Sequence, residues 1–424
     1  MRRIPLGRHT VRLETLDNGL EVLILADPDS PVTAFHTWFK VGSRHDRPGK
    51  TGLAHLFEHL MFGETENLAH GEFDRRIEAV GASMNAATWL DWTYYHETFL
   101  PEHLPMIAEL EAERMARLRL EEEPVRREKE VVANERRFRV ENSVEGAASE
   151  RLWKEAFRVH PYGHPTIGWM EDIVGFTVED CRTFYRTYYA PNNAALVVVG
   201  PVDEERTLDL VRRTHGWMKP QPIPPPPDVV EPPQEGERSQ RLPWPTPTRK
   251  TCLAWRAPEL AHPDHPALVV LAQVLFGGRS GRLQRRLVHD GEIAADLQGG
   301  PGSFRDPSLF EIWVDLREGR THEEALAAIE AELGRLAEAP PEPAELETAR
   351  NQVLLRFRSA LETAAGRADR IGFFHVTVGD VGAIERRQRE LLAVGAEDVR
   401  AAARKYLVPA TRNVLLVDPA EAPS

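Results

Sequence analysis

The chain has 424 residues and a formal net charge of −13, from 53 Lys and Arg against 66 Asp and Glu. With 42% hydrophobic and 28% charged residues, its composition excludes a collagen-like fibre, a membrane bundle and a chain disordered throughout, and its length suffices for two domains. The acidic balance disfavours nucleic-acid binding, which needs clustered cations. No apolar run approaches the about 18 residues of a spanning helix, and the start lacks an apolar signal segment, so we expect no membrane contact and a cytoplasmic protein. An exported, trimmed protein is the alternative.

The clearest boundary in the chain is the proline-dense stretch 219–250. Proline fixes φ and removes a backbone donor, so prolines at this density are incompatible with a helix or a central strand. We therefore expect a first domain at 1–218, an extended linker at 219–250 and a second domain at 251–424. The alternative is a long surface loop within one domain.

The first half mixes short strands with longer helices. Asp17, Asn18 and Gly19 separate two apolar runs, which is typical of a tight hairpin turn. Apolar residues at helical spacing between Thr51, a suitable N-cap, and Gly63 predict a helix there. The other elements expected in this half are strands at 32–41, 83–98 and 194–200 and helices at 72–80, 102–120 and 124–157.

The second half has the same mixture, and hairpins beside long helices favour an α+β fold over a doubly wound parallel sheet. The elements expected there are strands at 251–257, 309–316 and 413–417 and helices at 266–276, 321–337 and 343–370. Residues 53–63 (LAHLFEHLMFG) and 267–277 (ALVVLAQVLFG) end alike. This faint repeat indicates two related domains, each a mixed, mostly antiparallel sheet packed against helices, and chance similarity between two amphipathic helices is the alternative.

The polar residues of the first of these helices form a compact pattern, His55-Leu56-Phe57-Glu58-His59. Residues four apart on a helix stack one turn above each other, so both imidazoles project side by side, and Glu58 shares their face. Two imidazoles in this arrangement can bind zinc, with a carboxylate beside them as base. The alternative is a pair of partly buried histidines that only make hydrogen bonds.

A catalytic zinc usually has three protein ligands, so a third must come from elsewhere in the chain. In the expected helix after Pro124, four residues share one stripe: Glu128, Val131, Glu135 and Phe138. We interpret this stripe as inward-facing, which would leave its two carboxylates in need of partners such as a metal and a supporting contact. The alternative is a solvated charge run, because Glu is a good helix former.

Together these residues resemble the pitrilysin family of metallopeptidases, the inverzincins, and in particular its half-size branch, which is similar to the mitochondrial processing peptidase. The family pattern is H-x-x-E-H followed by two Glu seven residues apart; here Glu135 follows His59 by 76 residues, and Glu128 precedes Glu135 by seven. Other stretches also resemble the family: VGSRHD, GASMNAATWLDWTYY, HPYGHPTIG, YYAPNNAALVVVG and FGGRSGRLQRRL.

The resemblance implies one Zn²⁺ per chain, in the first domain, with the second domain free of metal. Its ligands would be His55, His59 and Glu135, with Glu58 as general base and Glu128 supporting the site from outside. The implied activity is that of a zinc-dependent endopeptidase, which hydrolyses peptides or unfolded segments with a zinc-activated water. The first alternative is a non-catalytic subunit of a larger assembly that keeps the zinc as structure, and the second is an acidic binding module.

The strand at 83–88 (SMNAAT) is similar to the edge strand with which the family holds extended peptides by strand addition. This similarity implies that Asn85, Ala86 and Ala87 bind substrate. An ordinary solvent-capped edge is the alternative.

One departure from the family concerns subunit composition. Active members place an Arg and a Tyr, seven residues apart, after the glycine-rich turn of the second type of half; here Val288 and Ala295 stand there, and neither side chain can donate a hydrogen bond. In the half-size branch this pair comes from a partner subunit. The resemblance thus implies a heterodimer with a related chain that lacks zinc ligands, more than a homodimer, unless Arg285 or Arg286 serves instead. We expect His160 and His164, which lie among prolines, to have a structural role in a loop.

Overall fold

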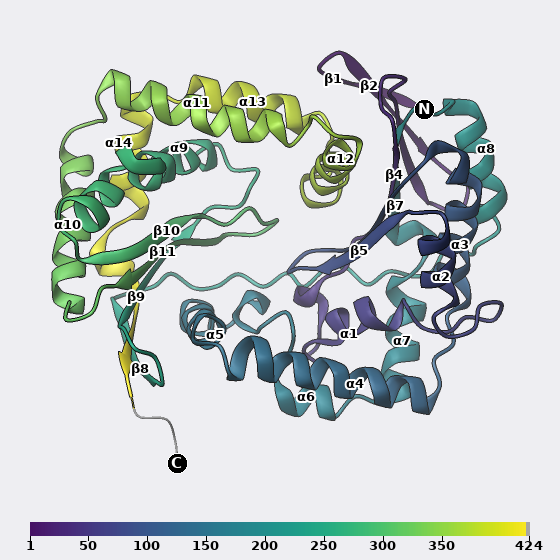
Figure 1. Cartoon of the computed structure of the whole chain (residues 1–424), viewed down its shortest axis with the longest axis horizontal. Helices are drawn as coiled ribbons and strands as arrows, with labels where there is room; N and C mark the ends of the chain where they lie inside the picture. Colours follow the sequence, from purple (N-terminus) through teal and green to yellow (C-terminus); the bar gives the residue numbers. More distant parts are fainter. Residues whose placement is uncertain (421–424) are drawn as a thin grey trace. The chain divides into compact units, whose positions relative to one another are not determined.

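The computed structural model describes residues 1–420 and divides into two compact units (Figure 1). Each unit draws on separated parts of the chain. Among the described residues, the first unit holds 1–136, 164–228 and 359–385, and the second holds 137–163, 229–358 and 386–420.

The first unit is built on a seven-stranded sheet of order β1-β2-β3-β7-β4-β6-β5. Its strands are β1 (Arg2–Leu6), β2 (His9–Thr15), β3 (Glu21–Ala26), β4 (Thr33–Phe39), β5 (Ser83–Thr88), β6 (Thr93–Phe99) and β7 (Ala194–Gly200). All neighbours are antiparallel except β3 and β7. The uninterrupted apolar sequence of β7 follows from its position, because both faces of this central strand are buried.

Helices cover both faces of this sheet. The helices of this unit are α1 (Leu53–Leu60), α2 (Glu72–Ala79), α3 (Leu104–Arg117), α4 (Glu122–Arg136), α6 (Met170–Val174), α7 (Val178–Tyr188), α8 (Glu204–His215) and α12 (Ala364–Val378). Of these, α4 packs on α1 and α6 and not directly on the sheet. Figure 1 shows α12, which comes from the second half of the sequence, on one side of β4 and β7, and α3 and α8 on the other.

Helix α12 is held on the sheet by close packing and by charge. A Cβ on Gly372 would lie 2.0 Å from Nε1 of the buried Trp38, so this helix position requires glycine. An ion pair joins Arg367 to Asp27, and His375 Nε2 lies 3.0 Å from a carboxylate oxygen of Glu21. The helix is therefore an integral part of the first unit.

The second unit has a five-stranded sheet of order β10-β11-β9-β12-β8, in which only β12 and β8 are parallel. Its strands are β8 (Arg238–Trp244), β9 (Lys250–Ala257), β10 (Ala294–Pro301), β11 (Ser308–Leu316) and β12 (Asn413–Pro419). Its helices are α5 (Val144–Ala156), α9 (His265–Phe276), α10 (His322–Glu338), α11 (Pro343–Ser359), most of α13 (Ala383–Ala393) and α14 (Ala396–Tyr406).

Helix α5, from the first half of the sequence, packs on β9 and β12 of this second sheet (Figure 1). Trp153 Nε1 donates to Glu311 over 2.8 Å, and Glu145 pairs with Lys250 over 2.9 Å. The two halves of the sequence thus exchange one helix each, α5 for α12.

The expected α+β class is confirmed, with a mixed, mostly antiparallel sheet and covering helices in each unit. The boundaries 1–218, 219–250 and 251–424 stay a prediction. Within the expected linker, residues 238–244 form β8, because they can hydrogen-bond to the free edge of β12. Within residues 1–420, none of the helices combines the length and the apolar composition that a membrane-spanning helix needs.

Two expected long helices are wrong because each contains an unrecognised cap. The helix expected at 124–157 is α4, a π-helical stretch at Arg137–Glu141 and then α5, which begins after Ser143; the Ser143 side chain accepts from Gly146 N–H. The helix expected at 343–370 ends at Ser359, and Thr363 caps α12 by accepting from Gly366 N–H. Likewise, the strand expected at 83–98 is the hairpin of β5 and β6.

Candidate metal centre

Helix α1 carries three of the expected site residues and is anchored by its apolar side. Leu56 and Phe57 are fully buried and His55 is 8% exposed, while Glu58 and His59 are half-buried. The alternation of apolar and polar residues over two turns therefore fixes which side of the helix packs and which side carries the polar groups.

The cap of α1 differs from the sequence expectation. Thr51 does not cap the helix; its hydroxyl donates to Asp172 over 2.5 Å. The N-cap is Gly52 with φ 90°, where a Cβ would come within 2.3 Å of the Ile167 carbonyl oxygen. Asp46 caps from outside by accepting from Gly52 N–H (2.8 Å) and Ala54 N–H (3.0 Å). Glycine is needed here because the chain turns into the helix against another backbone segment.

The three expected ligands come together in the first unit. Oε2 of Glu135 lies 3.3 Å from Nε2 of His59 and 3.6 Å from Nε2 of His55, and the ligand atoms of all three residues lie within 4.8 Å of one another. The two imidazole rings, 5.0 Å apart, are inclined at 67°.

These distances fit a metal ion at the centre of the group. Ligands about 2.0–2.2 Å from a tetrahedral zinc are roughly 3.3–3.6 Å from one another, whereas an ordinary N–H···O bond is about 2.9 Å long. Two imidazole nitrogens and one carboxylate oxygen are also the donor set of catalytic zinc sites, which leave a fourth position open. The donors of this chain therefore fit Zn²⁺.

Glu128 and Glu135 are placed by α4, but the stripe that they share does not face the core. Val131 is 44% exposed and Phe138 is 76% exposed, so the inward-facing interpretation is wrong for the apolar members of the stripe. The buried side of α4 is the adjacent one, with Val125, Val132, Ala133 and Arg136. The carboxylates lie where α4 meets α1, which is why they are half-buried while the other stripe residues are open.

Glu128 approaches the far side of one imidazole. Its Oε2 lies 3.9 Å from Nδ1 of His59, the ring nitrogen that does not face Glu135. This distance is too long for a hydrogen bond, so the carboxylate is a charged neighbour of the ring on the side away from Glu135.

Burial and neighbouring charges shift the pKa values of two site residues. For Glu58, burial raises the pKa; the neighbouring Thr88 and the His59 charge oppose this effect, and the net shift is upward. For His59, burial lowers the pKa, but the carboxylate of Glu135, 3.3 Å from Nε2, outweighs burial and raises it. Before any metal binds, the site thus combines a carboxyl that gains protons easily with an imidazole paired to an acid.

The edge strand β5 ends beside Glu58. The expected substrate-binding residues Asn85, Ala86 and Ala87 lie on β5, which has only β6 as a neighbour. The N–H of Ala86 donates to Asn85 Oδ1 over 2.9 Å, so it points away from β6. Backbone N–H and C=O groups point to alternate sides along an antiparallel strand, so those of every second residue of β5 point to the open edge. A peptide that paired with this edge would bond to the Ala86 N–H in place of the Asn85 side chain.

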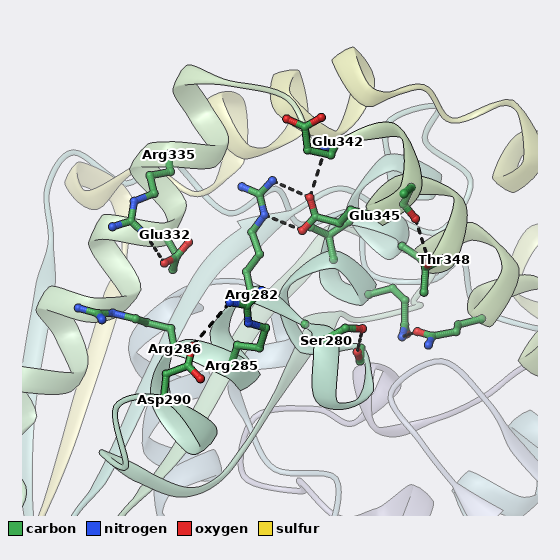
Figure 2. Close-up of a pocket in the computed structure, with 17 residues that line it drawn as sticks. Ser280, Arg282, Arg285, Arg286, Asp290, Glu332, Arg335, Glu342, Glu345 and Thr348 are labelled. Carbon is green, nitrogen blue, oxygen red and sulfur yellow. Dashed lines mark hydrogen bonds and ion pairs between the residues drawn. The ribbon is translucent and has the colours of Figure 1, made fainter.

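The residues at the expected Arg and Tyr positions lie in the second unit and carry no donor. Val288 packs partly buried on the core of that unit, and Ala295 is exposed on β10. The same segment borders a cavity of about 740 Å³ with α10 and α11 (Figure 2). In this cavity Arg282 pairs with Glu345 through two 2.7 Å bonds, and Arg285 faces Asp290 at 3.7 Å.

Among the other sequence candidates, His160 has the expected structural role in a loop. Its Nε2 lies 3.1 Å from Asp306, and its Nδ1 accepts from Tyr162 N–H. Sequence reasoning missed Asp46 as the cap of α1; the signal was a lone acid in a polar turn, VGSRHD, close before the helix.

Comparison with known proteins gives consistent matches. Residues 21–169 match the family model "Insulinase (Peptidase family M16)", and residues 175–353 match "Peptidase M16 inactive domain". The chain is 31% identical to "Zinc protease PqqE" of Helicobacter pylori, over 96% of this chain and 92% of the relative. It is 24% identical to the beta subunit of the mitochondrial-processing peptidase of Lentinula edodes, over 93% of this chain and 87% of the relative. A crystal structure of a protease from Helicobacter pylori aligns with a TM-score of 0.93 at 30% identity, covering 98% of this chain and all of the other.

Proposed function

This chain belongs to the M16 family of peptidases, and from that premise we propose that it is a zinc-dependent endopeptidase acting on peptides or unfolded segments. The observation that carries the proposal is the position of Glu135. One of its carboxylate oxygens, Oε2, lies 3.3 Å from Nε2 of His59 and 3.6 Å from Nε2 of His55. A salt bridge alone would need one such contact, whereas a metal site needs both.

In the proposed site His55, His59 and Glu135 would hold one Zn²⁺, which when bound would polarise the scissile carbonyl and lower the pKa of an attacking water. Glu58 would act as general base, accepting a proton at its carboxylate and returning it to the departing amine. Its position on the same helix as the histidines fixes its distance from them, and Glu128 orients His59 from outside.

Strand β5 supplies the proposed peptide site. Its open edge can pair with the backbone of an extended substrate, which reads main chain instead of one particular side chain. Because Thr88, at the end of β5, lies against Glu58, a peptide on this edge would pass the base directly. Flexible substrates of varied sequence fit such a site best.

The test separates metal binding from catalysis. Glu58→Gln should keep one zinc per chain and lose hydrolysis of a quenched peptide, whereas His55→Ala and Glu135→Gln should lose the metal itself. Glu130→Gln is the matched control, because Glu130 lies on the solvent side of α4 and pairs with Arg126 over 2.6 Å. Full turnover by metal-replete Glu58→Gln protein would overturn the assignment of the base.

We further propose that the active form contains a second, related subunit. Val288 and Ala295 offer no donor to the reacting carbonyl, and one of the relatives is named as a beta subunit. A related chain without zinc ligands would then contribute the missing Arg and Tyr. Purification from the native source tests this proposal: a lone chain with full peptidase activity would overturn it.

A second candidate function is a non-catalytic subunit that keeps zinc as a structural element. The residues that favour it are the same Val288 and Ala295, and residues 175–353 match a family model described as inactive. Peptide assays with and without chelator, on the chain alone and with its copurifying partner, distinguish this function from the peptidase.

A further inference from the structure

Besides the cap at its N-terminus, helix α1 is held by two buried tyrosine hydroxyl groups that are linked to each other. The Tyr95 hydroxyl lies 3.2 Å from the carbonyl oxygen of Phe57 and 3.0 Å from the hydroxyl of Tyr189. Phe57 is the residue before Glu58 and lies between the two histidines. Tyr95 and Phe57 are fully buried, and Tyr189 is nearly so.

The direction of these hydrogen bonds follows from what each atom can do. A carbonyl oxygen only accepts, so Tyr95 must donate its single proton to Phe57. The bond between the two phenols must then be donated by Tyr189. The result is an ordered relay, from Tyr189 to Tyr95 to the backbone of α1, in which each bond polarises the next.

The ring of Tyr95 rests on a buried cation. The guanidinium carbon of Arg114 lies 4.3 Å from the centre of that ring, and Arg114 pairs with Glu97 (3.0 Å) and Glu111 (2.5 Å). Glu111 is held in turn by the Thr37 hydroxyl over 2.6 Å. Because every member of this cluster is almost fully buried, the ring has no room to move, and its hydroxyl is held at one place.

The carbonyl of Phe57 already accepts the helical bond from Met61 N–H over 3.1 Å. The Tyr95 bond is therefore an addition to the helix ladder and is not needed to form it. The Tyr95 bond can instead fix the turn that spans His55 to His59, both in its position along the helix axis and in its rotation about that axis. Ligands to a metal must be held to within a fraction of an ångström, and a packed apolar face alone leaves a helix some freedom to slide.

We propose that Tyr95 is a positioning residue for the metal centre: through its hydroxyl bond to the Phe57 carbonyl it sets the spacing of the two imidazoles and of Glu58 relative to Glu135. This inference rests on the proposed function for its catalytic consequence, but not for the structural one. Groups that orient metal ligands from outside change metal affinity or activity by roughly 10–100-fold when removed.

The experiment replaces one hydroxyl at a time. Tyr95→Phe should weaken zinc binding, measured by chelator competition, by about 10-fold, alter the visible spectrum of the Co²⁺-substituted protein, and lower kcat more than it changes KM. Tyr185→Phe is the control, since the Tyr185 hydroxyl lies in the same aromatic cluster but bonds the backbone at Arg114, Met115 and Leu118. It should lower stability and leave zinc affinity and the Co²⁺ spectrum unchanged.

A third measurement keeps this inference separate from the proposed function. Amide hydrogen exchange of metal-free protein should show faster exchange across α1 in Tyr95→Phe than in Tyr185→Phe. If wild-type protein binds no zinc, the proposed function fails, and the exchange data still decide the role of Tyr95. Equal exchange in both variants, or wild-type zinc affinity and spectrum in Tyr95→Phe, would overturn the inference.

Discussion

The packing of α12 on the first sheet makes Gly372→Ala a sharp test of this fold. An added Cβ would lie 2.0 Å from Nε1 and 2.3 Å from Cε2 of Trp38, which is about 1.4 and 1.1 Å short of the 3.4 Å at which ordinary contact begins. The ring cannot give way, because Trp38 is fully buried and stacks on Tyr94 with 4.2 Å between ring centres. The helix itself must therefore move.

The expected cost combines two opposing effects. Overpacking of a rigid core costs about 1–3 kcal/mol, and a displacement of this size places the substitution near the upper end. The change from glycine to alanine within a helix gains about 1 kcal/mol. We expect a net loss of about 2 kcal/mol, or roughly 4–8 °C in Tm for a unit of this size.

Thermal and urea unfolding of the full chain, followed by tryptophan fluorescence, measure this loss. Gly334→Ala is the matched control, because Gly334 lies within α10 and its added Cβ would meet no atom within 4 Å. It should stabilise the protein by about 0.5–1 kcal/mol. If Gly372→Ala is also neutral or stabilising, α12 does not lie against Trp38, and the exchange of helices described above is wrong.

Three further predictions concern acidic residues: Glu21, which contacts α12, and Asp46 and Glu128, which contact α1. Burial alone would raise the pKa of Glu21, but His375 and Lys40 lower it to about 2; its contribution of up to about 3 kcal/mol should thus be present above pH 4.5 and lost as pH falls toward 2. In acid unfolding, the difference in the free energy of unfolding between wild type and Glu21→Gln should shrink over that pH range. A difference that stays constant with pH would contradict this explanation. Asp46→Ala should lower the free energy of unfolding by about 0.5–2 kcal/mol in urea titrations, and Asp46→Asn by less because one oxygen acceptor remains; equal losses would argue against a capping role. Glu128→Gln should weaken zinc binding by about 10-fold in chelator competition, and an unchanged affinity would show that Glu128 does not orient His59.

The sequence predicted the candidate site best where the information is local. His55, Glu58 and His59 lie on one helical turn, so their common face follows from helix geometry alone. Glu135 was a candidate from its stripe, but only the resemblance to a family pattern made it the third ligand, since nothing in the residues around it says which helix it will face. The structure brings Glu135 to the two imidazoles, and its role as a ligand stays a prediction until metal is measured.

Residues that act over long sequence distances were missed. Tyr95 lies 38 residues from Phe57, and its place in the alternating pattern of β6 indicates only that its side chain is buried. Asp46 is nearer, but an acid in a turn does not show which helix end it will cap. In both cases the partner is chosen by tertiary packing, which local periodicity does not contain.

The fold errors have the same origin. Ser143 and Thr363 are ordinary N-caps, yet each lies within a long run of helix formers, so propensity concealed the break. The stripe of Glu128 and Val131 was assigned inward because a mixed polar and apolar stripe does not reveal which side packs; burial of Val132 and Ala133 instead turns it toward α1 and solvent.

The reciprocal placement of α5 and α12 has a consequence for synthesis of the chain on the ribosome. Strands β4 and β7 emerge early, but α12, the helix that covers them, ends at Val378. One apolar face of the first sheet therefore stays uncovered until most of the polypeptide has been made. Cutting the gene within the proline-rich stretch would deprive each fragment of one covering helix. Such fragments should aggregate when produced singly and recover when produced together, as complementing pieces of one cooperative whole.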